Sequence, residues 1–304
     1  MSLGNPLRLI KDDYTRDHVL FSTDTAIHYI NLLSGQTEIL VGGRSGYKEG
    51  IGTDAKFTHI KDFCTGPKSD SLWVVDYRIP CIRNVNRNTN KTSAVIGNCQ
   101  GNDSSRFARL TTIERNPNQA FEYFVYSSLD IQILRVYRTQ TDIWKMEELY
   151  HWRDIVVDLI FNPTGDYIYL ATFEGIWKQN LQPGKAKELV VSTEEVGNHL
   201  FQSKYVSGLF FFDEKYLLAP ELRYHTINVL NIKLNVSTKM CFNTAGSDLA
   251  GGSLSTCKLR FPSSIIMHPT DRNKILIGGR DLMTLTCKFN STLYFIKLIV
   301  PFAN

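Results

Sequence analysis

The chain has 304 residues, with 34 basic and 30 acidic side chains and a formal net charge of +4. These charges are spread along the whole length, so no segment has the concentrated positive charge that nucleic acid requires, and no nucleic-acid partner is expected. No apolar run reaches the roughly 18 to 20 residues that span a bilayer, so no membrane span is expected.

The first part of the chain alternates short apolar segments with turn residues. Four such segments, each the length of a strand, precede the first glycine-rich loop; they cover residues 7–10, 19–22, 27–31 and 38–41. We expect them to form one four-stranded antiparallel sheet.

The clearest local pattern follows, from Gly42 to Val85. A glycine-rich loop over residues 42–52 leads to an apolar strand at 57–64, a turn at 66–70 and a second strand at 72–75. Two more strands are predicted at 82–85 and 93–96. Glycine at this density marks a tight connection between sheets, and the spacing of the loop is not that of a phosphate-binding loop.

This segment resembles the NHL repeat. The resemblance rests on Gly46-Tyr47-Lys48-Glu49-Gly50, on Ala55-Lys56-Phe57, and on Val74-Val75-Asp76 followed six residues later by Ile82, with Ile79 standing where the family usually has Asn. The resemblance implies a blade of a β-propeller. It also implies a role as an interaction platform, which NHL propellers often have.

The same frame recurs along the chain with a period of about 50 residues. Its opening residues are Phe57, Phe107, Ile155, Tyr205 and Phe261. We therefore predict one all-β domain over residues 1–304, a six-bladed β-propeller with four antiparallel strands per blade. The expected blades cover approximately 5–43, 55–98, 105–150, 153–192, 203–245 and 259–302, with 294–300 as the last outer strand. A five-bladed ring with an irregular N-terminal cap and a pair of β-sandwiches are the alternatives.

In a propeller the first strand of each blade lines the central channel. Two positions after each opening residue stand His59, Arg109, Val157, Ser207 and Ser263. One hypothesis makes His59, Arg109, Ser207 and Ser263 a binding layer at the channel mouth, where the first two contact an anion or carboxylate. The alternative is a solvated layer without a ligand. Asp76 is predicted to stabilise a turn, and no catalytic residue, metal site or cofactor is predicted.

Six cysteines without CxxC spacing favour disulfides or buried thiols over zinc. The preferred pair is Cys241 with Cys257, which would close a glycine-rich loop. Cys64 and Cys81 are a second candidate pair, provided that their Cα atoms come within about 7 Å. Sequons at Asn90, Asn102, Asn235 and Asn290 fall in predicted turns and are candidate glycosylation sites.

These observations leave three functions open. The first is a non-catalytic secreted or cell-surface recognition module, which binds a protein or glycan through loops on one face of a monomeric propeller. The second is a metal-dependent propeller hydrolase or lyase, with an ion such as calcium in the channel. The third is an intracellular NHL-type interaction scaffold. Fold alone does not choose among them.

Overall fold

The computed structural model describes residues 8–12, 15, 17–99, 109–182, 184–192, 205–234, 236–241, 259–279, 281–286 and 295–301. This part of the chain is almost entirely β-structure, with a single-turn 3-10 helix at Gly52–Asp54. It contains no helix with the length and hydrophobicity that a membrane span requires.

The strands form six four-stranded antiparallel sheets. The first sheet contains β1 (Leu9–Lys11), β2 (His18–Ser22), β3 (Ala26–Asn31) and β4 (Thr37–Gly42), and the second contains β5 (Ile60–Thr65), β6 (Ser71–Asp76), β7 (Cys81–Asn86) and β8 (Lys91–Gly97). The third contains β9 (Leu110–Arg115), β10 (Glu122–Ser127), β11 (Gln132–Arg138) and β12 (Trp144–His151), and the fourth β13 (Val156–Phe161), β14 (Tyr167–Thr172), β15 (Gly175–Asn180) and β16 (Glu188–Ser192). The fifth contains β17 (Phe210–Phe211), β18 (Tyr216–Glu221), β19 (Thr226–Asn231) and β20 (Val236–Met240), and the sixth β21 (Ser264–Met267), β22 (Lys274–Gly278), β23 (Asp281–Thr286) and β24 (Phe295–Pro301).

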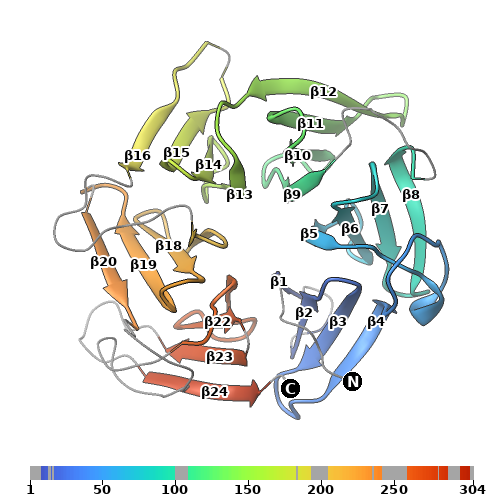
Figure 1. The fold of residues 1–304 in the computed structure, drawn as a ribbon, viewed down its shortest axis with the longest axis horizontal. Coiled ribbons are helices and arrows are strands. Elements are labelled where there is room, and N and C mark those ends of the chain that lie inside the picture. The colour runs from blue at the N-terminus through green and yellow to red at the C-terminus, as the bar shows by residue number, and fades with distance from the viewer. Residues whose placement is uncertain are drawn as a thin grey trace.

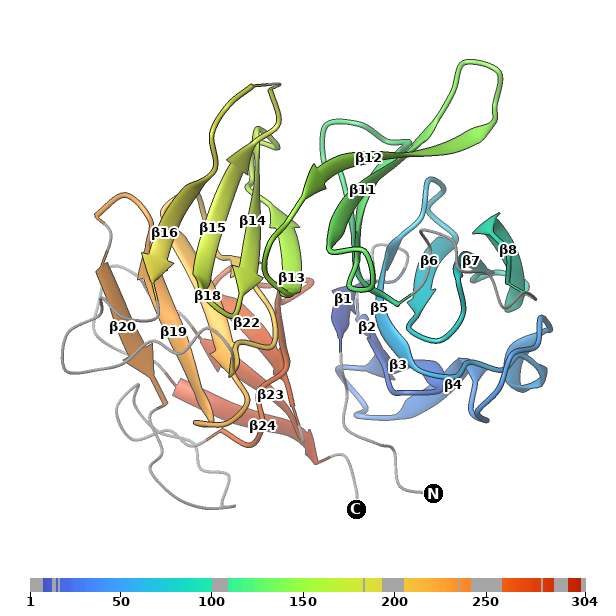
Figure 2. The same cartoon turned by 45° about the horizontal axis from the view of Figure 1, so that its top comes forward.

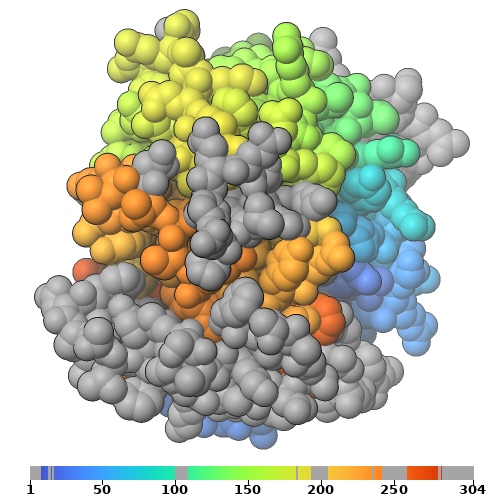
Figure 3. Space-filling model, turned by 60° about the vertical axis from the view of Figure 1, so that its left-hand side comes forward, coloured from blue at the N-terminus to red at the C-terminus, as the bar shows by residue number. Residues whose placement is uncertain are grey.

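The sheets stand around a central axis as the blades of a propeller (Figure 1). Strands β1, β5, β9 and β13 lie nearest the axis, and β4, β8, β12, β16, β20 and β24 form the rim. Figure 2, in which the ring is turned by 45°, shows the four strands of the fourth blade side by side. In Figure 3 the yellow and orange surfaces of the fourth and fifth blades adjoin. The predicted all-β propeller with four-stranded antiparallel blades is therefore confirmed.

Burial within each blade follows from the stacking of sheets. Strands β6 and β10 are buried at every residue, whereas the outer strand β8 is mostly exposed or half-buried. Both faces of a middle strand are covered by neighbouring blades, so its sequence is apolar without alternation. The rings of Trp73 and Tyr123, for example, stack with centroids 4.1 Å apart across the second and third blades.

The ring closes between the first and sixth blades, as predicted. The backbone N–H of Leu9 donates to Ser264 Oγ at 3.0 Å, and Leu9 packs in one apolar cluster with Ile266 and Leu276. Strand β24 pairs with β23 of its own blade. Each blade is thus built from one contiguous stretch of chain.

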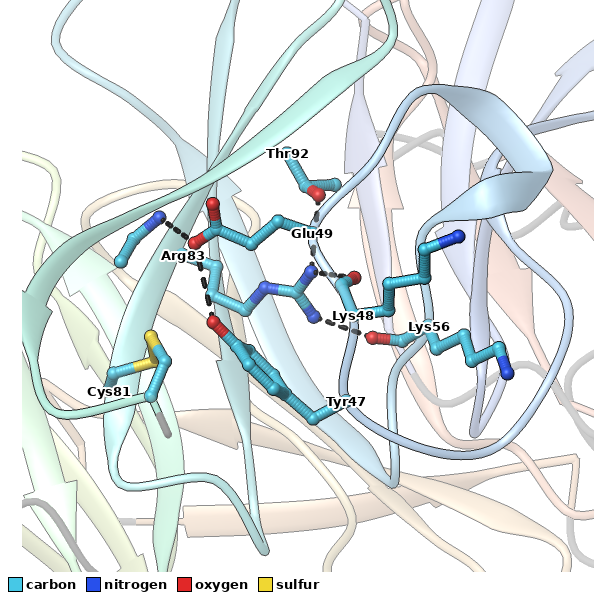
Figure 4. Close-up of a disulfide and its surroundings, with 9 residues drawn as sticks. Tyr47, Lys48, Glu49, Lys56, Cys81, Arg83 and Thr92 are labelled. Carbon is cyan, nitrogen blue, oxygen red and sulfur yellow. Dashed lines mark hydrogen bonds between the residues drawn. A yellow bond between two sulfur atoms is a disulfide. The ribbon is translucent and has the colours of Figure 1, made fainter. Parts of the chain in front are cut away.

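The glycine-rich loop belongs to the connection between the first two blades, where a buried arginine holds it (Figure 4). The guanidinium of Arg83 donates to the carbonyl oxygens of Lys48, at 2.8 Å, and Lys56, at 2.7 Å. It lies between the rings of Tyr47 and Phe57. Burial lowers the pKa of this guanidinium. The loop thus shapes a blade junction.

One disulfide prediction is wrong. Cys81 is bonded to Cys99, and Cys64 is a buried free thiol. The sheet order β5-β6-β7-β8 explains the error, because β6 separates the strands of Cys64 and Cys81 by two inter-strand spacings, about 9.5 Å. That exceeds what a disulfide spans.

Of the other predicted cysteine and glycosylation sites, Cys241 and Asn90 are among the described residues. Cys241 is disulfide-bonded, and its predicted partner Cys257 lies outside the described residues. Asn90 lies in the tight turn between β7 and β8, as predicted. The other three sequons, at Asn102, Asn235 and Asn290, fall outside the described residues. Pairing of Cys241 and glycosylation stay predictions.

Candidate functional site

The first strands of three consecutive blades carry a β-bulge at the same place. In the second blade Ile60 pairs with Asp76 and Asp62 with Val75, which leaves Lys61 as an extra residue. The same shift makes Thr111 the extra residue in β9 and Val157 in β13. A bulge re-aims the side chain of the extra residue. All three of these residues line one pocket at the channel mouth.

Ser207 and Ser263 line the same pocket. Each precedes the inner strand of its blade, and its N–H donates to a carbonyl of the adjacent strand, Pro220 for Ser207 and Gly278 for Ser263. We call Lys61, Thr111, Val157, Ser207 and Ser263 the mouth layer.

The predicted layer matches the mouth layer in three blades and misses it in two. Val157, Ser207 and Ser263 belong to both, but His59 stands two residues before Lys61, and Arg109 two before Thr111. A binding role for these residues stays a prediction. The distance from the opening residue to the mouth layer differs between blades: it is four residues from Phe57 to Lys61, but two residues from Ile155 to Val157. A common offset from the opening residue therefore fails.

Two adjoining pockets form a groove across the channel mouth. The larger, about 720 Å³, is lined by the mouth layer and by loop residues of the fourth, fifth and sixth blades. The second, about 510 Å³, is lined by residues of the second and third blades, His59 and Arg109 among them. Lys61, Thr111 and Ile155 line both. We call the combined depression the mouth groove.

The half of the mouth groove formed by blades four to six is apolar and exposed. Ile155, Phe173, Leu222 and Phe261 are between 39% and 46% exposed, although each is a large hydrophobic side chain. The ring of Tyr205 lies beside them under the guanidinium of Arg223, 4.8 Å from ring centroid to guanidinium carbon. Apolar groups gathered in one concave patch are typical of a binding surface.

The other half of the mouth groove is cationic. Lys61, Arg78 and Arg109 line it, and no described residue lining either pocket is Asp or Glu. No salt bridge of these three cations occurs within the described part of the chain, although Lys61 Nζ lies 5.5 Å from the centre of the Tyr77 ring. His59 differs, because its Nδ1 lies 2.9 Å from Asp24 Oδ1. Burial and nearby Lys61 lower the His59 pKa.

Two residues at the groove hold an unusual backbone conformation. Arg109 has φ 55° and Phe261 has φ 49°, both in the left-handed region that side chains with a Cβ rarely adopt. The carbonyl of Arg109 accepts hydrogen bonds from Ser128 N and Oγ, at 3.1 and 3.0 Å. The N–H of Phe261 donates to His225 Nδ1 at 3.0 Å, and the two rings make an edge contact. These contacts hold the backbone of both residues, and that of Phe261 also its ring, at the groove.

Asp76 builds the frame of the cationic half, as its predicted turn role requires. Its carboxylate accepts from the backbone N–H of Thr58 at 2.6 Å, His59 at 3.1 Å and Arg78 at 3.3 Å, and from the Thr58 hydroxyl. A carboxylate that gathers three backbone N–H groups fixes two loops together. The hydroxyls of Ser207 and Ser263 likewise donate to backbone carbonyls.

Below the mouth layer, a guanidinium crosses the channel. Arg8 contacts Asp62 of the second blade at 3.1 Å, Glu114 of the third at 3.2 Å and Asp158 of the fourth at 3.1 Å. Only 14% of its side chain is exposed. We call these four residues the central cluster. Beyond it, at the other end of the channel, lies a smaller pocket of about 340 Å³ that Arg8 and Glu114 help to line.

Acceptor side chains at the same layer join alternate blades. Asp62 accepts from the N–H of Ile113 at 2.9 Å, and Asp158 accepts from the N–H of Leu209 at 2.7 Å. Ser264 accepts from Leu9 in the corresponding way at the ring closure. The second, fourth and sixth blades thus each hold the inner strand of the next blade. The central cluster is part of the ring's framework.

The charges of the central cluster are strongly coupled. Burial opposes the charged form of Arg8, but Asp158, Asp62 and Glu114 outweigh it and raise the Arg8 pKa. Burial, against the pull of Arg8, raises the pKa of Asp62 to about 6 and that of Glu114 to about 8. Glu114 therefore takes up a proton at a higher pH than Asp62 does.

Sequence reasoning missed the central cluster. A local signal exists, because an aspartate stands in an inner strand in both segments, beside Lys61 in Ile60-Lys61-Asp62-Phe63 and among apolar residues in Val156-Val157-Asp158-Leu159. An acid in an apolar first strand indicates a buried partner. Three carboxylates from three blades converge here, but on a guanidinium. Among the described residues, no three His, Cys, Asp or Glu side chains are grouped as metal ligands would be.

Comparisons with known proteins identify the fold. No family model matches the chain, and no curated protein matches it either. Among solved structures, an auxiliary nutrient binding protein from Bacteroides thetaiotaomicron is similar, with a TM-score of 0.69 and 14% identity over 98% of this chain and 70% of that one.

Two further solved structures have a TM-score of 0.68, over 97% of this chain and 70% of theirs. One is an auxiliary nutrient binding protein from Bacteroides ovatus, 14% identical, and the other a structural genomics protein of unknown function from Bacteroides thetaiotaomicron, 10% identical. At identities of 10% to 14%, the likeness shows the fold alone. The chain has the β-propeller fold, and the resemblance to the NHL family has no matching family model behind it.

Proposed function

We propose that this propeller is a non-catalytic recognition module that binds a protein or glycan at the mouth groove. The observation that carries the proposal is the groove itself, in which exposed Phe173, Phe261 and Ile155 face a concave space of about 720 Å³. Beside it lie cations that form no salt bridge with another described residue. That volume falls in the range of roughly 300 to 1,000 Å³ of small-ligand sites. It favours a glycan chain or a single inserted side chain over a flat protein interface.

The proposal extends to location and family. A disulfide between Cys81 and Cys99 fits a secreted or cell-surface protein, since such bonds form and persist in oxidising compartments. The nutrient-binding names of two structurally similar proteins agree with a binding role. The NHL-like loop and Val74-Val75-Asp76 motif support a distant relation to NHL propellers. A disulfide and glycan map of the protein from its native source tests location: a reduced Cys81 with bare Asn90 would contradict export.

A glycan array tests the binding function. We expect wild-type protein to bind a subset of neutral or acidic oligosaccharides, and Phe173→Ser with Phe261→Asn to abolish that binding, because Asn tolerates the backbone of position 261. Leu33→Ser is the matched control, since Leu33 is 81% exposed in the β3–β4 turn, on the opposite face. Binding that survives the double variant would contradict the groove.

The non-catalytic part has a separate readout. A bound oligosaccharide incubated with the protein should be recovered with unchanged mass, and the appearance of shorter or unsaturated fragments would show a hydrolase or lyase instead. Parallel incubations with added calcium or zinc test the metal-dependent alternative by the same mass measurement.

A further inference from the structure

We infer that the mouth groove binds an acidic glycan, in which a carboxylate or sulfate contacts the cationic half and the non-polar face of a sugar ring packs on the aromatic half. This inference rests on the proposed function and names the ligand class. It depends on three features of the groove: its separation into two halves, its cations without a lining carboxylate among the described residues, and the constrained backbone of two lining residues.

The two halves of the groove lie side by side within the reach of one ligand. Lys61 and Thr111 line both pockets, with Arg78 and Arg109 on one side and Val157 and the aromatic residues on the other. A ligand that fills both pockets therefore meets cations at one end and apolar rings at the other. An acidic sugar has this amphipathic character, because its charge projects from a ring with a non-polar face.

The polar groups at the groove are mainly donors. Lysine and arginine side chains have no acceptor, and no carboxylate lines the groove within the described residues. Ser207 and Ser263 already donate their hydroxyl protons to backbone carbonyls, so their oxygens can accept from the hydroxyl groups of a sugar. A carboxylate or sulfate, which only accepts, complements the cations, and a guanidinium binds either through two parallel hydrogen bonds.

A peptide complements the groove less well. Each peptide unit presents an N–H that needs an acceptor when it is buried. The described lining offers hydroxyl oxygens but no carboxylate or side-chain amide as an acceptor, and the outer edge strands lie at the rim of the ring, away from the axis (Figure 1). An acidic peptide is therefore the competing ligand in the test.

The backbone at Arg109 and Phe261 adds a positional argument. Both residues are held at positive φ by specific hydrogen bonds, and one contributes to each half of the groove. Such conformations are strained for residues with a Cβ and cluster where side-chain position matters for function. Arg109 and Phe261 are thus the two expected anchors, one for the anion and one for the sugar ring.

The test is calorimetric titration with matched oligosaccharides. The probes are a tetrasaccharide of galacturonic acid, the same chain with its carboxyl groups reduced to alcohols, a sulfated galactose tetrasaccharide and an octamer of glutamate. We expect one of the two acidic saccharides to bind at least about tenfold more tightly than the neutral chain, which corresponds to one lost charge-assisted hydrogen bond. The two acidic arms distinguish carboxylate from sulfate.

Variants assign the binding to the groove. Arg109→Asn and Lys61→Gln should each weaken the acidic saccharide about tenfold and leave the neutral chain unchanged. Arg272→Asn is the matched control, because Arg272 is exposed in the β21–β22 turn on the opposite face. Circular dichroism and thermal melting confirm that each variant is folded.

Failure of the inference and of the proposed function are distinguishable. If the neutral chain binds as tightly as the acidic ones and binding depends on Phe261, the groove is a glycan site and the acidic class is wrong. The inference also fails if the glutamate octamer binds more tightly than every saccharide. If no saccharide or peptide binds at all, both the inference and the proposed binding function are contradicted.

Discussion

The central cluster and the mouth groove lie in the same channel and use charge in opposite ways. In the central cluster, Arg8 is surrounded by three carboxylates and 14% of its side chain is exposed. At the mouth, Lys61, Arg78 and Arg109 have exposed or half-buried side chains. None of the described residues that line the groove with them is Asp or Glu. Whether a charge in this channel is structural or faces a ligand therefore depends on the groups that surround it.

The difference has a physical origin. A buried ion must be paired, because taking an isolated charge out of water costs several kcal/mol. A cation at the mouth is hydrated until a ligand arrives, and it then exchanges water for the ligand's anion. We therefore expect substitutions of the mouth cations to change binding, and substitutions in the central cluster to affect every blade that it joins.

The sharpest way to break this comparison is Arg8→Ala. The substitution leaves Asp62, Glu114 and Asp158 facing each other without a cation, so we expect the free energy of unfolding to fall by about 3 to 5 kcal/mol in urea denaturation. The loss for Arg8→Lys should be smaller than that for Arg8→Ala but larger than zero. An ammonium ion keeps the positive charge but lacks the planar fork with which a guanidinium contacts three carboxylates. A loss below about 1 kcal/mol for Arg8→Ala would show that the cluster is not structural.

Asp76→Ala tests whether the mouth itself has a rigid frame. Three backbone N–H groups lose their acceptor in a fully buried position, and we expect a loss of about 2 to 3 kcal/mol. The matched control is Asp213→Ala, whose carboxylate accepts from Lys215 and Tyr216 in an exposed turn where water replaces it. Equal losses for the two variants would contradict a special role for Asp76.

Glu114→Gln measures the charge coupling through pH. The pKa of Glu114 is raised to about 8, so between the unfolded value and pH 8 the folded state binds more protons than the unfolded state. The free energy of unfolding must therefore fall as pH rises through this window. Asp62, with its pKa raised to about 6, adds the same trend at lower pH.

In urea melts from pH 7 to 8.5, wild-type protein should lose about 1 to 2 kcal/mol and Glu114→Gln should lose less. This range lies above the titration of His28, whose pKa burial lowers to about 4 and whose effect has the opposite sign. Glu214→Gln, at an exposed turn, is the control and should keep the wild-type slope. An unchanged slope in Glu114→Gln would assign the pH dependence elsewhere.

The blades were predictable because their determinants are local. Short apolar strands, turns such as 66–70 and a period of about 50 residues are properties of neighbouring residues, and they placed the second blade closely. The mouth layer was predictable only in part. The mouth layer lies four residues after the opening residue in the second and third blades and two residues after it in the other three, and a fixed offset cannot follow this change.

The central cluster was not predictable from pattern alone, because its partners lie far apart in the chain. Arg8 and Asp158 are 150 residues apart, and their contact depends on the number of blades and on ring closure. The cysteines teach the same lesson at shorter range. Cys64 and Cys81 are close in sequence, yet the order of strands within the blade places Cys99 beside Cys81 instead.

The smallest expected effect on stability is that of Arg109→Asn, and it completes the comparison with Arg8. Asn tolerates φ 55°, and the hydrogen bonds at position 109 come from the backbone carbonyl, so we expect the free energy of unfolding to stay within about 0.5 kcal/mol of wild type. Arg109→Val should cost about 1 to 3 kcal/mol, because a β-branched residue strains this backbone. Urea denaturation of both variants separates the two contributions of the residue. A large loss in Arg109→Asn would mean that its guanidinium supports the ring as Arg8 does, and the division between a structural centre and a ligand-facing mouth would then fail.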